Sequence, residues 1–381
     1  MDTPASQGRL GPGGGTIARS RSGEGEPLSD ALPELMHVAV YRRPGEVVVE
    51  ERPVPRPGPG QVLVEVDHCG VCGSDVHMLV DGWGAPGMVA GHEFAGIVRA
   101  LGSDVSGWSA GDVVVGGPAP RCGHCRRCLE GKPSQCERRG TIIDGHVDGA
   151  FAGFVLSDSR ALRRVPTGLD PRAAALAEPL AVALHGITRA GLSDEDTVMI
   201  FGAGPIGALA LAALVAEGRT ATVVEPSEAR RGLAARLGAR AVVQPGDLAR
   251  FERHQPERLA DQPVDVVLEC SGKKAAMELG LHQLGRGGRL VLVGAGMDEP
   301  TFDPNRVLLN ELEIRGSFVY DADGFERALA LLASGAVPVD VLVEQTDVTL
   351  DGIPAALAGL ASARIAGKIM VVPRVSGKPV T

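Results

Sequence analysis

Residues 197–218, TVMIFGAGPIGALALAALVAEG, contain a short apolar run, the glycine motif Gly202-Ala-Gly204-Pro-Ile206-Gly207, and a long apolar segment. This order predicts a buried β-strand that leads through a tight turn into a helix, the arrangement of a dinucleotide-binding fold. The glycines let the backbone approach a pyrophosphate, which the N-terminal end of the helix attracts. The motif alone is a weak signal in a chain with 52 glycines, but its position between strand and helix makes this copy specific.

The next apolar run, ATVVEP at 221–226, ends with Glu225, eighteen residues after Gly207. A carboxylate at this position accepts both hydroxyls of the adenosine ribose and repels a 2′-phosphate, so the sequence predicts NAD rather than NADP. Arg230 follows in the next expected helix. It either covers the adenosine or is a solvated helix charge, and the sequence leaves both interpretations open.

The rest of the chain has two patterns on either side of residue 188. Short strand-like runs at 46–51, 61–67 and 112–117 are separated by Pro/Gly-rich turns, whereas strands alternate with helices over 188–321. We therefore predict an α/β fold. A mostly β catalytic domain spans 35–187 and is completed by a C-terminal return over 322–381, and a doubly wound parallel sheet spans 188–321. Residues 1–34, rich in Gly, Ser, Arg and Pro, are expected to be disordered.

The composition excludes several function classes. The formal net charge of −9, without a basic stripe, argues against nucleic-acid binding. There is no apolar run of membrane-spanning length and no signal-peptide pattern, so we expect a cytoplasmic protein without a membrane partner. The seven cysteines are odd in number and clustered, which favours metal ligation over disulfides.

Four of these cysteines have the spacing of a zinc site: Cys122-x2-Cys125-x2-Cys128-x7-Cys136. Four thiolates this close on one loop can surround a zinc ion tetrahedrally and leave no open position, so the predicted role is structural. A zinc-ribbon nucleic-acid module has similar CxxC pairs, but the acidic charge and the large α/β remainder argue against it.

A second cluster of potential ligands lies in CGVCGSDVH at 69–77 and GHEFAG at 91–96. Cys72 and His92, with Glu93 beside the histidine, suit a catalytic zinc that keeps one position open for water or substrate. A CGVC redox pair is the alternative for the cysteines, but the strand–CxxC–helix unit that such a pair needs is not evident. His92 alone would more often be a structural residue, and its neighbours favour the ligand interpretation.

Together these motifs, in this order, resemble the zinc-containing medium-chain alcohol dehydrogenases over residues 37–381, and the polyol (sorbitol and butanediol) dehydrogenase branch most closely. The resemblance implies a GroES-like catalytic domain and a Rossmann cofactor domain. It makes Cys72 and His92 two ligands of the catalytic zinc and places the third at Glu178, in AEPLAVALHG. Glu93 is the competing carboxylate ligand, and a plain helix N-terminal charge is the alternative role for Glu178.

The resemblance also assigns residues around the metal and the nicotinamide. Asp75 resembles the carboxylate that orients the zinc-bound histidine, and Ser74 and His77 resemble a proton relay. Lys368 is matched weakly to a pyrophosphate contact. The implied cofactor-binding set is Gly202, Gly204, Ile206, Gly207, Glu225, Arg230, Val293, Gly294, Ala295, Ser317 and Phe318. Sorbitol-type enzymes carry a tyrosine and an arginine where this chain has Met78 and Val319, which favours a smaller or less hydroxylated alcohol.

The expected protein is thus a zinc-dependent, NAD-linked oxidoreductase with two zinc ions per chain. It transfers a hydride between NAD and a secondary alcohol, diol or polyol, or the matching ketone, and it works as a homodimer or homotetramer. The rival interpretations are a non-enzymatic NAD sensor on the same fold and a zinc-free enone or quinone reductase. The presence of both ligand sets, Ser74 and His77 argues against each of them.

Overall fold

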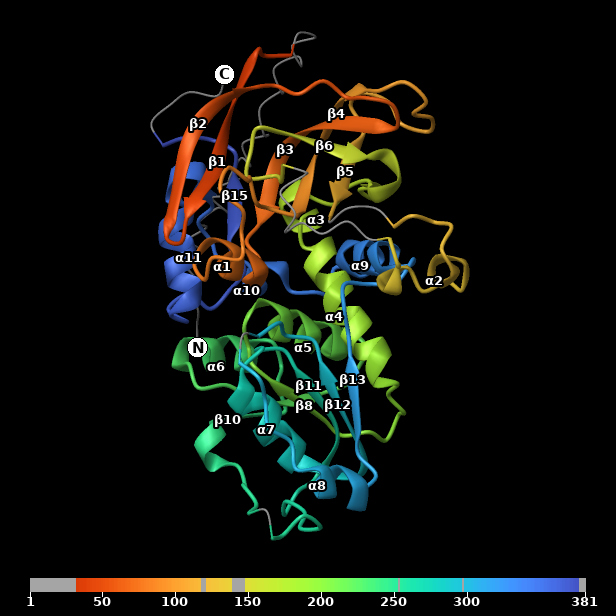
Figure 1. Ribbon diagram of the computed structural model, residues 1–381, viewed down its shortest axis with the longest axis vertical. Helices are drawn as coiled ribbons and strands as arrows, with labels where there is room; N and C mark the ends of the chain where they lie inside the picture. Colours follow the sequence, from red (N-terminus) through yellow and green to blue (C-terminus); the bar gives the residue numbers. More distant parts are fainter. Residues whose placement is uncertain (1–31, 118–120, 139–147, 253, 297, 377–381) are drawn as a thin grey trace, which may run out of the picture. The chain divides into compact units, whose positions relative to one another are not determined.

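A six-stranded, wholly parallel sheet forms in the computed structural model where the sequence predicts the dinucleotide fold (Figure 1). The strand order is β10-β9-β8-β11-β12-β13, with the crossover between β8 and β11 that marks a doubly wound sheet. The strands are β8 (Val198–Phe201), β9 (Ala221–Val224), β10 (Ala241–Val243), β11 (Val264–Glu269), β12 (Leu284–Leu292) and β13 (Glu313–Gly316).

The glycine motif makes the turn from β8 into α5 (Pro205–Ala216). Gly202 has a positive φ of 91°, and a Cβ on Gly207 would lie 1.9 Å from the Gly202 carbonyl oxygen, so neither position accepts a side chain. From Gly207 to Leu214 every residue of α5 is buried, which explains why this helix is apolar all round. The other helices that alternate with these strands are α6 (Glu228–Arg236), α7 (Lys274–Gln283) and α8 (Pro304–Leu309).

The second large sheet combines strands from the first half of the chain with two from its C-terminal part. Its order is β14-β15-β3-β4-β5-β7, and β6 pairs with the other part of β3. Its strands are β3 (Gln61–Gly70), β4 (Glu93–Leu101), β5 (Val113–Gly116), β6 (Phe154–Asp158), β7 (Arg163–Arg164), β14 (Val348–Thr349) and β15 (Met370–Val372). β1 (Leu35–Arg43) and β2 (Glu46–Pro53) form a separate antiparallel hairpin. The C-terminal segment therefore returns to the catalytic sheet, and the predicted domain limits stay a prediction.

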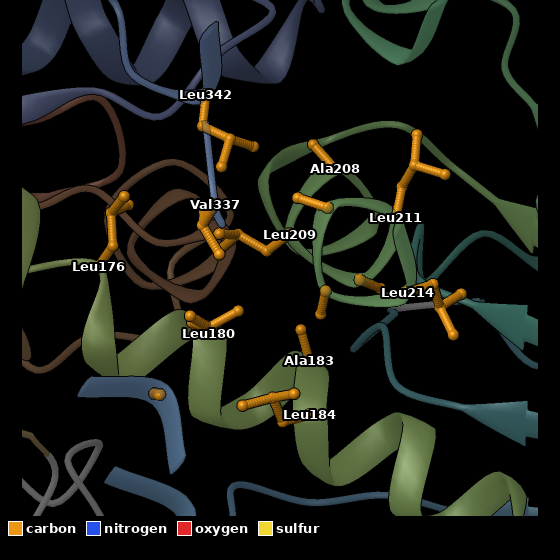
Figure 2. Close-up of a cluster of buried hydrophobic side chains, with 14 of the residues drawn as sticks. Leu176, Leu180, Ala183, Leu184, Ala208, Leu209, Leu211, Leu214, Val337 and Leu342 are labelled. Carbon is orange, nitrogen blue, oxygen red and sulfur yellow. The ribbon is translucent and has the colours of Figure 1, made fainter. Parts of the chain in front are cut away.

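Helix α4 (Ala177–Ala190) packs its apolar face in one core cluster with α5. Figure 2 shows Leu180, Ala183 and Leu184 of α4 opposite Ala208 and Leu209 of α5. This buried contact holds the N-terminus of α4, which carries Glu178, in a fixed relation to the glycine turn. The remaining helices are α1 (Gly73–Leu79), α2 (Arg126–Leu129), α3 (Pro171–Ala174), α9 (Gly324–Ala333), α10 (Val339–Leu342) and α11 (Ile353–Ala361).

The structure describes residues 32–117, 121–138, 148–252, 254–296 and 298–376, and those from Pro33 onward belong to one compact unit. The expected disorder of residues 1–34 falls outside the described residues except for 32–34. None of the helices within these ranges is long and apolar enough to cross a bilayer.

Candidate active site and structural metal lobe

The four cysteines of the 122–136 loop converge on one point. Their sulfur atoms all lie within 4.8 Å of one another, with 3.9 Å between Cys122 and Cys128 and 4.0 Å between Cys125 and Cys136. A zinc tetrathiolate with bonds of about 2.3 Å has sulfur–sulfur edges of about 3.8 Å, so the donor set fits this ion. The Cys125 backbone N–H points at the Cys122 sulfur from 3.3 Å, as expected around thiolates.

The second ligand set gathers at the ends of two antiparallel strands. Cys72 is the N-cap of α1, two residues after the end of β3. His92 immediately precedes β4, whose first residue, Glu93, is paired with Gly70. One ligand atom each from Cys72, His92 and Glu93 lies within 4.8 Å of the other two. A thiolate, an imidazole and a carboxylate form a donor set that suits zinc.

Glu93 also forms a buried ion pair with Lys368, the residue matched above to a pyrophosphate contact. Lys368 Nζ lies 2.7 Å from Glu93 Oε1 and donates to the Val71 carbonyl at 3.0 Å, and the lysine is only 2% exposed. Burial acts to lower the pKa of Lys368, but the neighbouring Glu93 and Cys72 raise it above its ordinary value. The weak match of Lys368 to a pyrophosphate contact is therefore wrong, because its ammonium is enclosed in a buried ion pair beside the metal ligands.

Glu178 lies in the first turn of α4, 4% exposed, and stands outside the compact group of three ligand atoms. Burial raises the pKa of its carboxyl to about 7, and no hydrogen bond from a described residue reaches its oxygens. A buried carboxylate without a donor is costly unless a cation compensates it. Its place in the first turn of α4 also fits the alternative of a charge favoured by the helix N-terminus, and both interpretations stay open at this point.

Asp75 and Ser74 flank the ring of His92. Asp75 is fully buried, accepts a hydrogen bond from the Cys72 N–H at 2.8 Å, and places Oδ1 3.7 Å from His92 Nδ1. Ser74 Oγ lies 3.4 Å from His92 Nε2. The carboxylate thus faces one ring nitrogen and leaves the other, beside the serine, available to a metal.

The glycine turn and Glu225 are in direct contact. Glu225 is 3% exposed; its Oε2 accepts from the Ala203 N–H at 2.7 Å and its Oε1 from the Ser227 N–H at 2.8 Å. Arg230 lies over Gly204 and donates to the Leu360 carbonyl at 3.1 Å, while its buried Nε has no hydrogen-bond partner among the described residues. Arg230 is thus partly buried at the glycine turn and is not a solvated helix charge.

The segments assigned to the nicotinamide follow the ends of β12 and β13. The Val293 and Gly294 N–H groups both donate to the Glu269 carbonyl at 2.9 Å, and a Cβ on Gly294 would lie 2.2 Å from the Gly272 nitrogen. Ala295 belongs to the same close contact, since its carbonyl meets Gly272. Ser317 N donates to the Leu292 carbonyl, and Phe318 beside it is 53% exposed. The loop after β12 thus contacts Gly272 in the loop after β11, and the neighbouring Ser271 contacts Gly202 of the glycine turn.

The two positions that depart from sorbitol-type enzymes, Met78 and Val319, differ in burial. Met78 is 1% exposed and packs in the core of the antiparallel sheet, so it is not available to a substrate. The missing tyrosine at this position therefore carries no argument about substrate size. Val319 is partly exposed with a φ of 53°, a conformation that branched residues rarely adopt. The expectation of a smaller alcohol therefore rests on Val319 alone.

A parallel sheet with a dinucleotide-binding motif, combined with a mostly antiparallel sheet whose connections carry two metal-ligand sets, defines the class of metal-dependent dehydrogenases. The family model of the alcohol dehydrogenase GroES-like domain matches residues 58–167, and that of the zinc-binding dehydrogenases matches residues 205–334. D-xylulose reductase A from Aspergillus oryzae is 33% identical over 312 residues, which cover 78% of this chain and 86% of that protein.

Two solved structures extend the comparison. A zinc-binding dehydrogenase from Sinorhizobium meliloti 1021, bound to NADP, has a TM-score of 0.78 and 31% identity, covering 90% of this chain and 100% of its own. The 2R,3R-butanediol dehydrogenase from Bacillus subtilis has a TM-score of 0.77 and 29% identity, covering 89% and 100%. The chain belongs to the zinc-binding alcohol dehydrogenase family. It is a zinc-dependent oxidoreductase that acts on alcohols with a nicotinamide cofactor, which confirms the predicted fold class and enzyme type.

Proposed function

We propose that this dehydrogenase oxidises a secondary alcohol, diol or polyol with NAD, or reduces the matching ketone. The observation that carries the proposal is the convergence of Cys72, His92 and Glu93 within 4.8 Å, next to Ser74, at one side of the fold. The names of the similar proteins, a D-xylulose reductase and a butanediol dehydrogenase, point to the same substrate class. Val319 favours the smaller members of that class.

Each residue of the site has a distinct part in this proposal. When bound, zinc polarises the alcohol oxygen, and the nicotinamide ring accepts the hydride. Cys72, His92 and Glu178 hold the ion, and the Asp75 carboxylate fixes the ring of His92. The Ser74 hydroxyl accepts the proton of the substrate hydroxyl and passes it toward His77.

The choice of Glu178 over Glu93 as third ligand follows from charge. The Glu93 carboxylate already has a cationic partner in Lys368, whereas no described residue donates to the Glu178 carboxylate. A thiolate and one carboxylate neutralise the divalent ion. Glu93 lies within reach of the same ion and would be a further oxygen donor to it. The four-cysteine lobe holds a second, structural zinc.

The proposed cofactor preference for NAD rests on Glu225. A 2′-phosphate on the adenosine ribose would meet this buried carboxylate. Arg231, the other nearby cation, is engaged with the Glu225 and Pro226 carbonyls at 3.1 and 2.6 Å. Glu225→Ala should bring kcat/KM for NADP closer to that for NAD, and an unmodified enzyme that is faster with NADP would contradict the assignment.

The proposed assembly is a homodimer in which β13 of two copies pair edge to edge. β13 is the terminal strand of its sheet, and apolar side chains near it are exposed: Leu308 (70%), Leu309 (46%), Ile314 (39%) and Phe318 (53%). Light scattering after size-exclusion chromatography measures the mass, and Ile314→Lys should shift the protein toward monomer. A tetramer requires a further interface.

The deciding experiment is a panel of secondary alcohols, vicinal diols and polyols, each assayed with NAD and NADP at the nicotinamide absorbance. We expect turnover on secondary alcohols with NAD and its loss after chelation of the catalytic zinc. A protein with both metals that binds NADH but turns over none of the panel would favour the sensor interpretation instead.

A further inference from the structure

His77 is in contact with the side chains of Asp81 and Trp83. Its Nδ1 lies 2.7 Å from Asp81 Oδ2, and its ring stacks on the indole of Trp83 with 4.8 Å between centroids and 23° between planes. Neither Asp81 nor Trp83 belongs to the metal-ligand sets. Together they fix both the direction of the imidazole and the plane in which it lies.

Local chain geometry produces this contact. Asp81 follows His77 by four residues, so both lie on one face just as α1 ends at Leu79. Gly82 then adopts a positive φ of 84°, and the chain reverses so that the Trp83 N–H donates to the His77 carbonyl at 3.2 Å. The reversal brings the indole back over the imidazole.

The carboxylate determines which ring nitrogen carries the proton. A carboxylate only accepts, so the neutral imidazole must hold its hydrogen on Nδ1 and present an unprotonated Nε2. No described residue hydrogen-bonds to Nε2. The indole face, with its negative quadrupole, further stabilises the ring once it becomes a cation.

We propose that Asp81 and Trp83 are positioning residues of the proton relay, which keep Nε2 of His77 ready to take up the proton released from the substrate hydroxyl. This inference rests on the relay role of His77 in the proposed function. The substrate O–H bond breaks, an N–H bond forms at Nε2, and the imidazolium then gives a proton to water or buffer. Asp81 remains a carboxylate throughout.

The exposure of the two side chains agrees with a path to solvent. The His77 side chain is 17% exposed, and the Asp81 side chain, one step further out, is 40% exposed. A contact this exposed contributes little to folding stability. A functional loss after its removal would therefore not be a stability effect.

The kinetic test compares Asp81→Ala with Glu278→Ala. Glu278 makes a similar i,i+4 pair, with Lys274 at 3.5 Å on α7, away from the relay. Asp81→Ala should lower kcat for alcohol oxidation about three- to ten-fold, part of what a positioned acid–base group contributes, without raising KM for NAD. Added imidazole buffer should restore the rate, because an external base then replaces the misdirected ring. Glu278→Ala should leave kcat unchanged and insensitive to imidazole.

A test by tryptophan fluorescence requires neither cofactor nor catalytic turnover. The chain has two tryptophans, so Trp108→Phe leaves Trp83 as the single emitter. In this background Asp81→Ala should change the Trp83 emission in the same direction as His77→Ala, since both remove the stacked imidazole. Thermal unfolding of each variant checks that the fold is intact.

The outcomes separate the inference from the function on which it rests. If His77→Ala retains full activity, the relay itself fails, whatever Asp81 does. If His77→Ala is impaired while Asp81→Ala keeps normal kcat and normal Trp83 emission, the positioning role is wrong. A lower melting temperature of Asp81→Ala without change in emission or imidazole response would likewise overturn it.

Discussion

The four-cysteine lobe takes all its ligands from fifteen consecutive residues, 122–136, whereas the proposed catalytic site takes Cys72, His92 and Glu178 from three elements and depends on Lys368 from a fourth. The first site needs only a loop that can curl around an ion. The second exists only when β3, β4, α4 and the C-terminal return are in place. Local spacing therefore specifies the lobe, while tertiary packing specifies the reactive centre, and loss of a ligand should have different consequences in the two.

The largest effect is expected at the catalytic site. Cys72→Ala should lower kcat/KM by about a thousand-fold or more, since a Lewis acid supplies several kcal/mol of transition-state stabilisation. Metal analysis should still find the lobe's zinc, and the melting temperature should change little. Cys69→Ala, three residues away and outside the ligand set, is the matched control and should keep both ions. Equal losses from both variants would favour a CGVC redox pair.

In the four-cysteine lobe, replacement of a ligand should lower the stability of the fold rather than kcat/KM. Cys122→Ser breaks a closed thiolate set whose binding contributes to folding. A loss of about 3 kcal/mol corresponds to a fall in melting temperature of roughly 6–12 °C for a domain of this size. The activity per folded molecule should persist at low temperature. Leu129→Ala, a 75%-exposed side chain on the same lobe, is the control. A complete loss of kcat in a folded Cys122→Ser protein would contradict the division of roles.

Further variants test which carboxylate, Glu178 or Glu93, is the third ligand of the catalytic zinc. Glu178→Gln keeps the shape but removes the charge, so kcat/KM should fall roughly ten- to hundred-fold and zinc should be retained less tightly. The paired variant Glu93→Gln with Lys368→Met removes the buried ion pair without leaving one charge unpaired. It should keep the zinc. If instead the double variant Glu93→Gln/Lys368→Met loses zinc while Glu178→Gln keeps it, Glu93 is the third ligand.

The smallest effect concerns a long-range contact that holds the catalytic segments together. His68 of β3 hydrogen-bonds to Asp67 through Nδ1, and its Nε2 lies 3.2 Å from Asp347 Oδ2, an aspartate that also accepts from Arg172 Nε at 2.8 Å. Burial acts to lower the pKa of His68, but the two carboxylates raise it above its ordinary value.

Because the folded pKa is raised, this stabilisation is present below the unfolded value of about 6.5 and is lost as the pH rises through the folded value. His68→Gln should therefore destabilise the protein more at pH 6 than at pH 9. The difference should be below about 1 kcal/mol, since the partners are partly exposed. Melting temperatures of both proteins across this range measure it, and a gap that widens with pH would contradict the assignment.

The same contrast explains what the sequence could predict. Cysteine spacing, the glycine turn and Glu225 are features of a few consecutive residues. In the structure the four sulfur atoms converge, the glycines turn from β8 into α5 and Glu225 follows β9, while their roles as ligands stay predictions. Lys368 was misassigned because its partner Glu93 lies 275 residues away, and no local pattern links the two. Met78 was misjudged because its burial depends on the core of the whole sheet. The Asp81–His77 pair was overlooked, although its i,i+4 spacing is a signal that helix geometry makes visible.

The buried Glu93–Lys368 pair also imposes an order on biosynthesis. Lys368 is polymerised 232 residues after Cys136 (368 − 136), which at 5–20 residues per second means roughly 10–50 s. During that interval a nascent chain already carries every cysteine needed to capture its structural zinc, yet it lacks the cation that balances Glu93. The lobe can thus be metallated on the ribosome, while the reactive centre is completed only after nearly the whole polypeptide has emerged. Catalytic competence is therefore acquired late in synthesis, after the lobe has become able to bind its ion.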